Sequence, residues 1–144
     1  MDDYEKYEKN VQKNIKRNER FLKEFKNEMN KQKLSQKTIN KHLNNIKFYL
    51  NTYLNYFDVI KMEDGAQKID LFLGDWFIHK CLWASITSIK ENATSIKKFY
   101  KCMYELNHID KDTYDDLCLS IKENMEDWLE ELTAFDNMDF DDFF

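Results

Sequence analysis

The chain has 144 residues, of which 42% are hydrophobic and 15% aromatic, and this composition excludes a protein that is disordered throughout. It contains no proline and only two glycines, which argues against tight β-hairpins and favours an all-α fold. The net charge of −5 is unevenly distributed, since residues 1–47 carry +6, residues 48–104 carry +1 and residues 105–144 carry −12.

The cysteines and the first residues of the sequence indicate the cellular compartment that we expect. Cys81, Cys102 and Cys118 form an odd set without a CxxC pair, which argues against a disulfide framework and a zinc ribbon. No signal peptide is apparent in "MDDYEKYEKN", and no stretch reaches the roughly 18 apolar residues of a membrane span. We therefore expect a reduced, cytoplasmic protein.

The first 57 residues predict two helices. In the first, apolar and aromatic side chains recur every three, four or seven residues, with Asn18 as the one interruption. This stripe comprises Tyr4, Tyr7, Val11, Ile15, Leu22, Phe25 and Met29. Ser35 is a plausible N-cap of the second helix. Its stripe comprises Ile39, Leu43, Ile46, Leu50, Leu54 and Phe57. His42 falls on the polar side, where we expect it to be solvated.

Three further helices are expected after an interruption at residues 58–66, where Gly65 is the expected chain reversal. Residues 67–83 are dense in large apolar groups and predict a buried central helix. Ser85 or Thr87 caps a fourth helix, and Asp110 or Asp112 caps a fifth. The inner faces of these two helices comprise Ile89, Ala93, Ile96, Tyr100, Met103, Tyr114, Leu117, Ile121, Met125, Trp128 and Leu132. Trp76, Trp83 and Trp128 are expected in the core.

The last ten residues, "FDNMDFDDFF", alternate acids with large apolar groups and show no helical stripe. We predict one helical domain over residues 1–134 and an acidic aromatic tail over residues 135–144. Either the tail only improves solubility, or it binds a partner. Its candidate partner-binding residues are Phe135, Asp136, Asp139, Phe140, Asp141, Asp142, Phe143 and Phe144.

No catalytic constellation is apparent, so we expect a protein that is not an enzyme and has neither a metal nor a cofactor. His42, His79 and His108 lie in three different segments. His79 and Cys81 are two residues apart, which on a helix directs them about 200° apart, so they cannot share a metal ion.

Lysines gather on the polar faces of the second and fourth helices, which is a pattern that suits phosphate binding. On the second helix Lys37, Lys41, Asn44 and Asn51 lie opposite the apolar stripe, with Lys33 and Ser35 at its start. On the fourth helix Lys90, Thr94, Lys97, Lys98 and Lys101 share one face. The alternative is an ordinary solvated surface, since lysine is a good helix former. Only two arginines, Arg17 and Arg20, occur.

The segments "NERFLKEFKNEMNKQKLSQKTINKHLNNIKFYLNTYL" and "FLGDWFIHKCLWASITSIKENATSIKKFYKCMYELNHI" resemble the paired helices of the core-binding, SAM-like N-terminal domain of tyrosine recombinases and phage integrases. The resemblance covers about residues 18–132 and is closest to short bacterial recombinase-like proteins that carry this domain alone. It implies a compact bundle of about five helices whose second and fourth helices face the major groove of DNA. The residues implied by position are Ser35, Lys37, Thr38, Lys41, Asn44, Ser88, Lys90, Asn92, Thr94, Lys97 and Lys98.

We expect no strand cleavage, because no histidine opens an HxxR motif and both arginines lie within the first helix. The predicted function is a non-catalytic DNA-binding module, an accessory or regulator of a mobile element in a bacterium, phage or plasmid. The alternative is an inhibitor whose acidic C-terminal region imitates DNA and binds a basic nuclease or recombinase. In a third reading, the tail folds back on the basic faces and suppresses nonspecific binding.

Overall fold

The computed structural model describes residues 2–138, and every regular element in this range is helical. The long helices are α1 (Asp3–Lys31), α2 (Gln36–Lys47), α6 (Ile86–Glu105) and α7 (Lys111–Asp136). The short ones are α3 (Met62–Gly65), α4 (Ile69–Leu71) and α5 (Phe77–Lys80), with π-helical segments η1 (Phe48–Tyr53) and η2 (Phe72–Trp76). The predicted all-α fold is confirmed.

Within residues 2–138 these elements form about six continuous helical segments. Segment η1 continues α2, and α4, η2 and α5 follow one another without a break. The segment beyond the five predicted helices is the short α3, which lies in the interruption predicted at residues 58–66. None of the described helices is long and apolar enough to cross a membrane.

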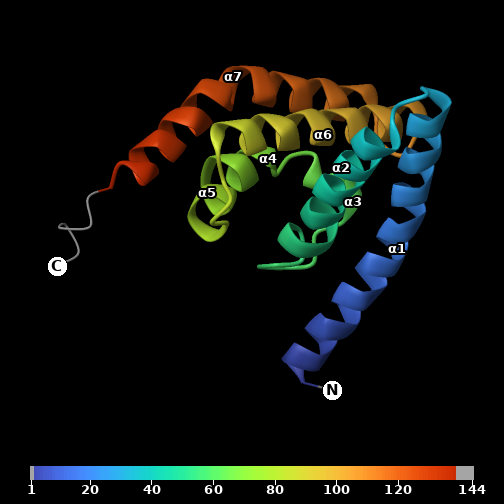
Figure 1. Ribbon diagram of the computed structural model, residues 1–144. Coiled ribbons are helices and arrows are strands. Elements are labelled where there is room, and N and C mark those ends of the chain that lie inside the picture. Colours follow the sequence, from blue (N-terminus) through green and yellow to red (C-terminus); the bar gives the residue numbers. More distant parts are fainter. Residues whose placement is uncertain (1, 139–144) are drawn as a thin grey trace.

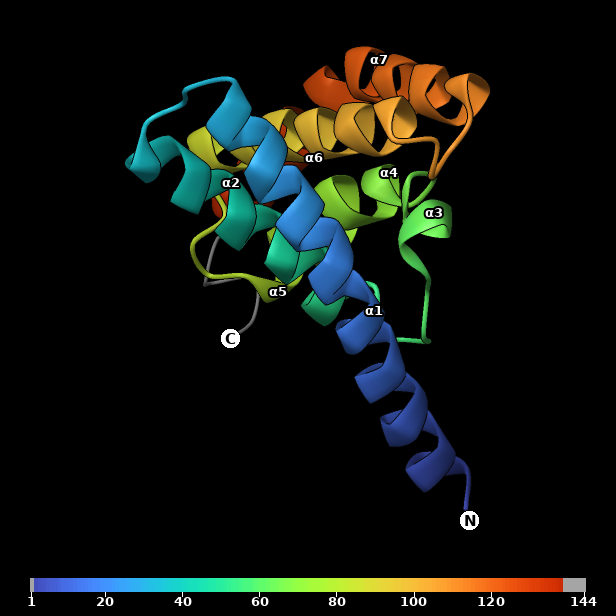
Figure 2. The same cartoon turned by 90° about the vertical axis from the view of Figure 1, so that its right-hand side faces the viewer.

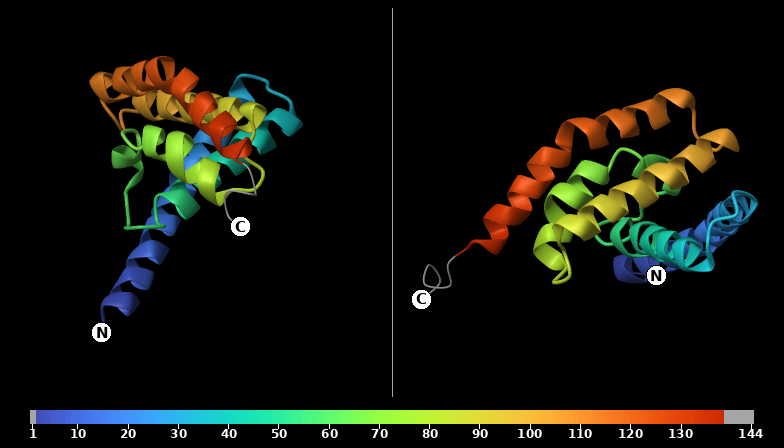
Figure 3. Two further views of the ribbon diagram at one scale, coloured as in Figure 1. Left: turned by 90° about the vertical axis from the view of Figure 1, so that its left-hand side faces the viewer. Right: turned by 45° about the horizontal axis from the view of Figure 1, so that its top comes forward.

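The long helices are arranged around α6. Helix α7 runs along one side of α6 and α2 packs on the other, while α4, η2 and α5 lie beneath the α6–α7 pair (Figure 1, Figure 3). Helix α2 thereby lies between α1 and α6, and the N-terminal end of α1 projects from the body (Figure 2).

Side-chain hydrogen bonds cap the N-termini of the long helices and show which of the predicted capping residues is used. The Ser35 hydroxyl accepts a hydrogen bond from the backbone N–H of Thr38 at 3.2 Å. Ser85 and Ser88 form a reciprocal capping box, so Ser85 rather than Thr87 begins α6. Asp110 rather than Asp112 begins α7.

The core is rich in aromatic side chains, but not every tryptophan belongs to it. Trp128 is buried, and its Nε1–H donates to Asp70 Oδ1 at 2.6 Å. Trp76 is also buried. The prediction is wrong for Trp83, whose residue surface is 60% exposed. It follows α5 in the connection to α6, where its ring only leans edge-on against Phe48 and Phe77.

Asn18 does not interrupt the stripe of α1, contrary to the prediction. Both Asn14 and Asn18 are buried, and their amides form hydrogen bonds with η1 and with the turn that follows it. Asn14 Nδ2 donates to Asn55 Oδ1 at 2.9 Å, and Asn18 Nδ2 donates to Asn51 Oδ1 at 2.9 Å. The inner face of α1 is therefore polar along η1 and becomes apolar towards its C-terminal end.

The stripes predicted for the first two helices reach further than the core does. At their outer ends, Tyr4 and Phe57 are exposed. Helix α7, in contrast, reaches beyond the predicted start of the tail, so that Phe135 and Asp136 are helical. Asp139, Phe140, Asp141, Asp142, Phe143 and Phe144 lie outside the described residues.

Gly65 ends α3 without a positive φ angle, so its role is close packing rather than the predicted chain reversal. A Cβ atom at this position would lie 2.5 Å from Leu54 Cδ1 and 2.8 Å from Tyr100 Oη. Neither neighbour is free to move away, because Leu54 is buried and the Tyr100 hydroxyl donates to the Met62 carbonyl at 2.6 Å.

Gly65→Ala is expected to lower the free energy of unfolding by about 1–3 kcal/mol, because the added methyl group overpacks this contact. The measurement is urea unfolding followed by circular dichroism. Gln67→Ala, at an exposed position two residues away, is the control and should change stability by less than about 0.5 kcal/mol. Equal stability of Gly65→Ala and the wild type would contradict the close packing.

Candidate nucleic-acid interface

Helix α2 lies within the longest stretch of the described chain that has no carboxylate. No aspartate or glutamate occurs between Glu28 and Asp58, whereas α2 itself carries Lys37, Lys41 and Lys47. All three lysines are exposed. The solvent side of α2 is therefore purely cationic and polar, a feature that the predicted site residues captured only in part.

On one side of α2, a shallow groove separates it from α1. Its floor contains Leu22 and Leu43, and its rim carries Lys23 and Lys26 from α1 with Asn44 and Lys47 from α2. Lys23, Lys26 and Lys47 were not among the predicted site residues. The signal available in the sequence was that Lys23 and Lys26 flank the apolar stripe of α1, but their proximity to α2 depends on how the two helices pack.

On the other side, α2 meets α6 through a buried polar contact. His42 Nδ1 lies 2.7 Å from Ser95 Oγ, and Asn45 Nδ2 donates to the same hydroxyl at 3.0 Å. His42 is only 6% exposed, so the predicted solvated position is wrong. The histidine points towards α6 because the polar edge of α2 faces Ser95 there rather than water.

Charged side chains of both helices surround His42 and influence its protonation. Burial lowers the pKa of the imidazole, and the positive charges of Lys41 and Lys98 lower it further, while Glu91 opposes them. Lys41 and Lys98 each lie about one turn from Asn45 and Ser95, which are hydrogen-bonded to each other across the two helices. These two lysines therefore lie on the edges along which α2 and α6 meet.

Most of the predicted DNA-binding residues reach solvent, but not all. The exposed ones are Lys33, Ser35, Lys37, Lys41, Asn44, Lys90, Thr94, Lys97 and Lys101, and Thr38, Ser88 and Lys98 are half-buried. None of these lysines forms an ion pair within residues 2–138.

Asn92 is a correction to the predicted site. It is buried, and its amide donates to the Ser88 carbonyl at 2.8 Å, because it faces the interior side of α6. The hydroxyls of Ser35 and Ser88 are engaged in helix caps, which leaves the lysines and Asn44 as the groups available to a ligand.

The far side of α6 has the opposite charge. Helix α7 has exposed carboxylates along most of its length. Within residues 2–138, Glu131 is the only one of them near a basic side chain, with 3.5 Å between its Oε1 and Nε2 of His79. The exposed acids are Asp112, Asp115, Asp116, Glu123, Glu126, Asp127, Glu130, Glu131 and Asp136. Lys90 lies at the boundary, in a groove with Lys122, Glu126 and Glu130. The described bundle thus has a basic α1–α2–α6 side and an acidic α7 side.

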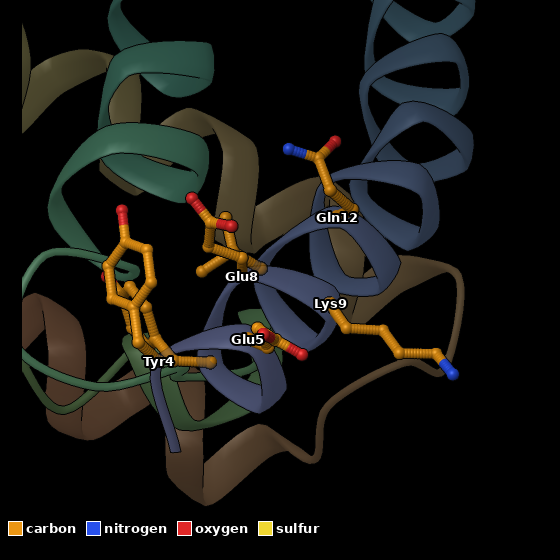
Figure 4. Close-up of a pocket in the computed structure, with 7 residues that line it drawn as sticks. Tyr4, Glu5, Glu8, Lys9 and Gln12 are labelled. Atoms are coloured by element: carbon orange, nitrogen blue, oxygen red, sulfur yellow. The ribbon is translucent and has the colours of Figure 1, made fainter. Parts of the chain in front are cut away.

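Other parts of the described chain offer little chemistry. The depression near the start of α1 is lined by that helix alone, with Lys9 directed away from Tyr4 and Glu8 (Figure 4). No group of three histidine, cysteine or acidic residues within residues 2–138 is arranged to hold a metal ion. Burial raises the pKa of the Cys81 and Cys102 thiols to about 11, so both are protonated at neutral pH.

Comparison of the chain with protein-family models, curated proteins and solved structures gives no significant match. The resemblance to recombinase core-binding domains therefore stays a prediction from the sequence.

His42 is expected to make stability depend on pH. Because its pKa is lowered in the folded state, the unfolded chain binds the proton more tightly. The stabilisation is complete above the unfolded pKa of about 6.5 and is lost as the pH falls from there through the lowered folded pKa. NMR titration of the ring protons should give a pKa for His42 below about 6.5.

Urea unfolding provides the matching thermodynamic measurement. His42→Gln should lose less stability than the wild type between pH 7.5 and pH 5.5, because glutamine does not titrate. An NMR pKa at or above the ordinary histidine value, or identical pH dependence of the two proteins, would contradict a buried neutral imidazole.

Proposed function

We propose that the chain is a non-catalytic DNA-binding module that presents α2 to duplex DNA. The observation that carries this proposal is an acid-free helix with lysines on both of its flanks, from α1 on one side and from α6 on the other. A helix with its side chains is about 10–12 Å wide, which matches the roughly 12 Å width of the major groove. With α2 in the groove, the flanking lysines face the phosphates of both strands.

The division of charge supports one orientation on DNA. Helix α7 carries nine acids and two lysines, and α6 separates it from α2. The phosphate backbone repels the α7 side and attracts the opposite side, so the protein approaches with α2 leading. Binding through lysines is then strongly dependent on salt, because each neutralised phosphate releases counterions.

The resemblance to the recombinase core-binding domain is consistent with this proposal. In that family the second and fourth helices of the SAM-like domain face DNA, and the corresponding elements here are α2 and α6. The proposed role is that of an accessory or regulatory protein of a mobile element, acting in the cytoplasm of a bacterium. A module of this size buries on the order of 600–1,000 Å² on DNA, so modest affinity is expected.

Lys37→Gln with Lys41→Gln is expected to weaken binding to duplex DNA and to reduce its dependence on salt. If both lysines contact phosphates, the slope of log affinity against log salt concentration should become shallower by about 1.8, since each contact contributes about 0.9. Fluorescence anisotropy with a labelled 20-base-pair duplex, measured over a salt series, gives both quantities.

The matched control is Lys6→Gln with Lys9→Gln, which removes the same charge from the projecting N-terminal end of α1. It should leave the slope within about 0.5 of the wild type, because long-range charge alone contributes little at moderate salt. Equal effects of the two pairs would reject α2 as the contact surface. Absence of binding by the wild type at low salt would reject the function.

The acidic face of α7 favours a second candidate, a protein that binds a basic nuclease or recombinase in place of DNA. Five of its exposed carboxylates, Asp112, Asp116, Glu123, Asp127 and Glu130, fall within one face about 60° wide. A row of this kind imitates the spaced negative charges of a nucleic-acid strand. The predicted tail residues 139–144 lie outside the described residues.

Titration calorimetry with a purified basic nuclease, in the absence of DNA, tests this candidate. Binding should be weakened at least tenfold by Glu123→Gln, Asp127→Asn and Glu130→Gln together, because the attraction is electrostatic. Glu5→Gln, Glu8→Gln and Glu19→Gln remove three exposed acids from α1 and should have a small effect. Equal weakening by both triple variants would show that only net charge matters.

A further inference from the structure

The solvent-exposed face of α2 carries a row of amide side chains between Lys41 and the lysines of α1. Gln36, Asn40 and Asn44 follow one another at intervals of four residues, so they lie on one face of the helix. All three are exposed. Gln36 Nε2 donates to Asn40 Oδ1 at 2.8 Å, which aligns the first two amides along this face.

The row stands between the two sets of lysines described above. Asn44 shares the α1–α2 groove with Lys23, Lys26 and Lys47. Lys41 lies one turn before Asn45, whose amide donates to Ser95 of α6 at 3.0 Å, so Lys41 is on the edge of α2 next to α6. If the lysines hold the two phosphate strands, the amides occupy the centre of the groove, where base edges are reached.

Amides are suited to one base in particular. An asparagine or glutamine side chain donates to N7 of adenine and accepts from its N6 amino group, forming two hydrogen bonds in the major groove. Guanine offers two acceptors at the same positions and is read by arginine or lysine. No arginine lies on α2, and its lysines are assigned here to the phosphates.

The spacing of the amides also fits the spacing of bases. Successive members of the row are separated by about 6 Å along the helix, since each residue rises by about 1.5 Å. Neighbouring base pairs are about 3.4 Å apart. The three amides therefore span a run of about four base pairs.

We infer that Gln36, Asn40 and Asn44 read adenine in the major groove, so that the ligand is duplex DNA rich in A·T pairs. This inference rests on the proposed DNA-binding function and adds the residues that select the sequence. It assigns affinity to the lysines and selectivity to the amides, and these two roles respond differently to substitution.

The test compares three labelled 20-base-pair duplexes by fluorescence anisotropy. One is of mixed A·T sequence, one is of mixed G·C sequence, and one is the A·T duplex with every adenine replaced by 7-deaza-adenine, which lacks the N7 acceptor. The wild type should prefer the A·T duplex at least about fivefold per engaged amide, the lower end for one bidentate contact. It should lose much of that preference on the 7-deaza duplex.

Variants separate base reading from phosphate binding. Asn40→Ala with Asn44→Ala should abolish most of the preference and leave the salt slope unchanged, and folding should be retained because alanine favours helix at exposed positions. Lys41→Ala should weaken binding to the A·T and G·C duplexes equally and make the slope shallower. Asn10→Ala with Gln12→Ala, at exposed positions near the N-terminal end of α1, is the matched amide control. It should change neither the preference for A·T nor the salt slope.

Equal affinity for all three duplexes, with a steep salt dependence, would overturn adenine reading and leave the proposed function standing. A preference for A·T that persists on the 7-deaza duplex or in the asparagine variant would also overturn it, because the selection would then come from elsewhere. Absence of binding to every duplex at low salt would reject both proposals.

Discussion

The position of α2 depends on polar contacts that hold it from both sides. On the α6 side, one hydroxyl, that of Ser95, is shared by His42 and Asn45. On the α1 side, Asn18 binds Asn51 of η1, which continues α2, and Asn14 binds Asn55 in the turn after η1. Buried polar groups cost about 1–3 kcal/mol each when they lose their partners. A shift of α2 along either neighbour would break several of these pairs together, so they fix its register more strictly than apolar contacts would.

This arrangement explains which parts of the fold could be predicted from the sequence. The long helices were predictable because their apolar residues recur with helical period and because Ser35, Ser85 and Asp110 are strong capping residues. The predicted inner face of α6 is confirmed at Ile89, Ile96 and Met103, all of which are buried. These signals are local in the sequence, and no knowledge of a neighbouring helix is needed to interpret them.

The errors at polar helix positions have a common physical cause. Asn18, His42 and Asn92 are polar residues in helices, and a periodicity argument assigns such residues to water. Each is instead buried with a hydrogen-bond partner. For Asn18 and His42 that partner lies 33 and 53 residues away, on another element. Whether a polar side chain is buried depends on such a partner being present, and the sequence around it does not contain this information.

The sequence indicated some of the lysines on the basic side of the bundle but not all of them. The lysines of the second and fourth helices were identified from the sequence, whereas Lys23, Lys26 and Lys47 join them only because α1 packs against α2. The separation of charge across α6 could be foreseen from the segment charges, since residues 1–47 and 105–144 have opposite signs. The sequence did not show that α6 would stand between them.

The buried polar contacts that hold α2 affect the proposed lysine and amide contacts to DNA differently. Lysines reach phosphates through long, flexible side chains, so a small displacement of α2 would change affinity little. Bidentate amide contacts require correct placement relative to the base edge, and short asparagine side chains cannot compensate for a displaced backbone. Loosening the contacts of Ser95 or Asn18 would therefore reduce selectivity before it reduced affinity. Under the proposed function, the buried amides and the buried histidine would serve recognition indirectly, because they hold α2 in register with its neighbours.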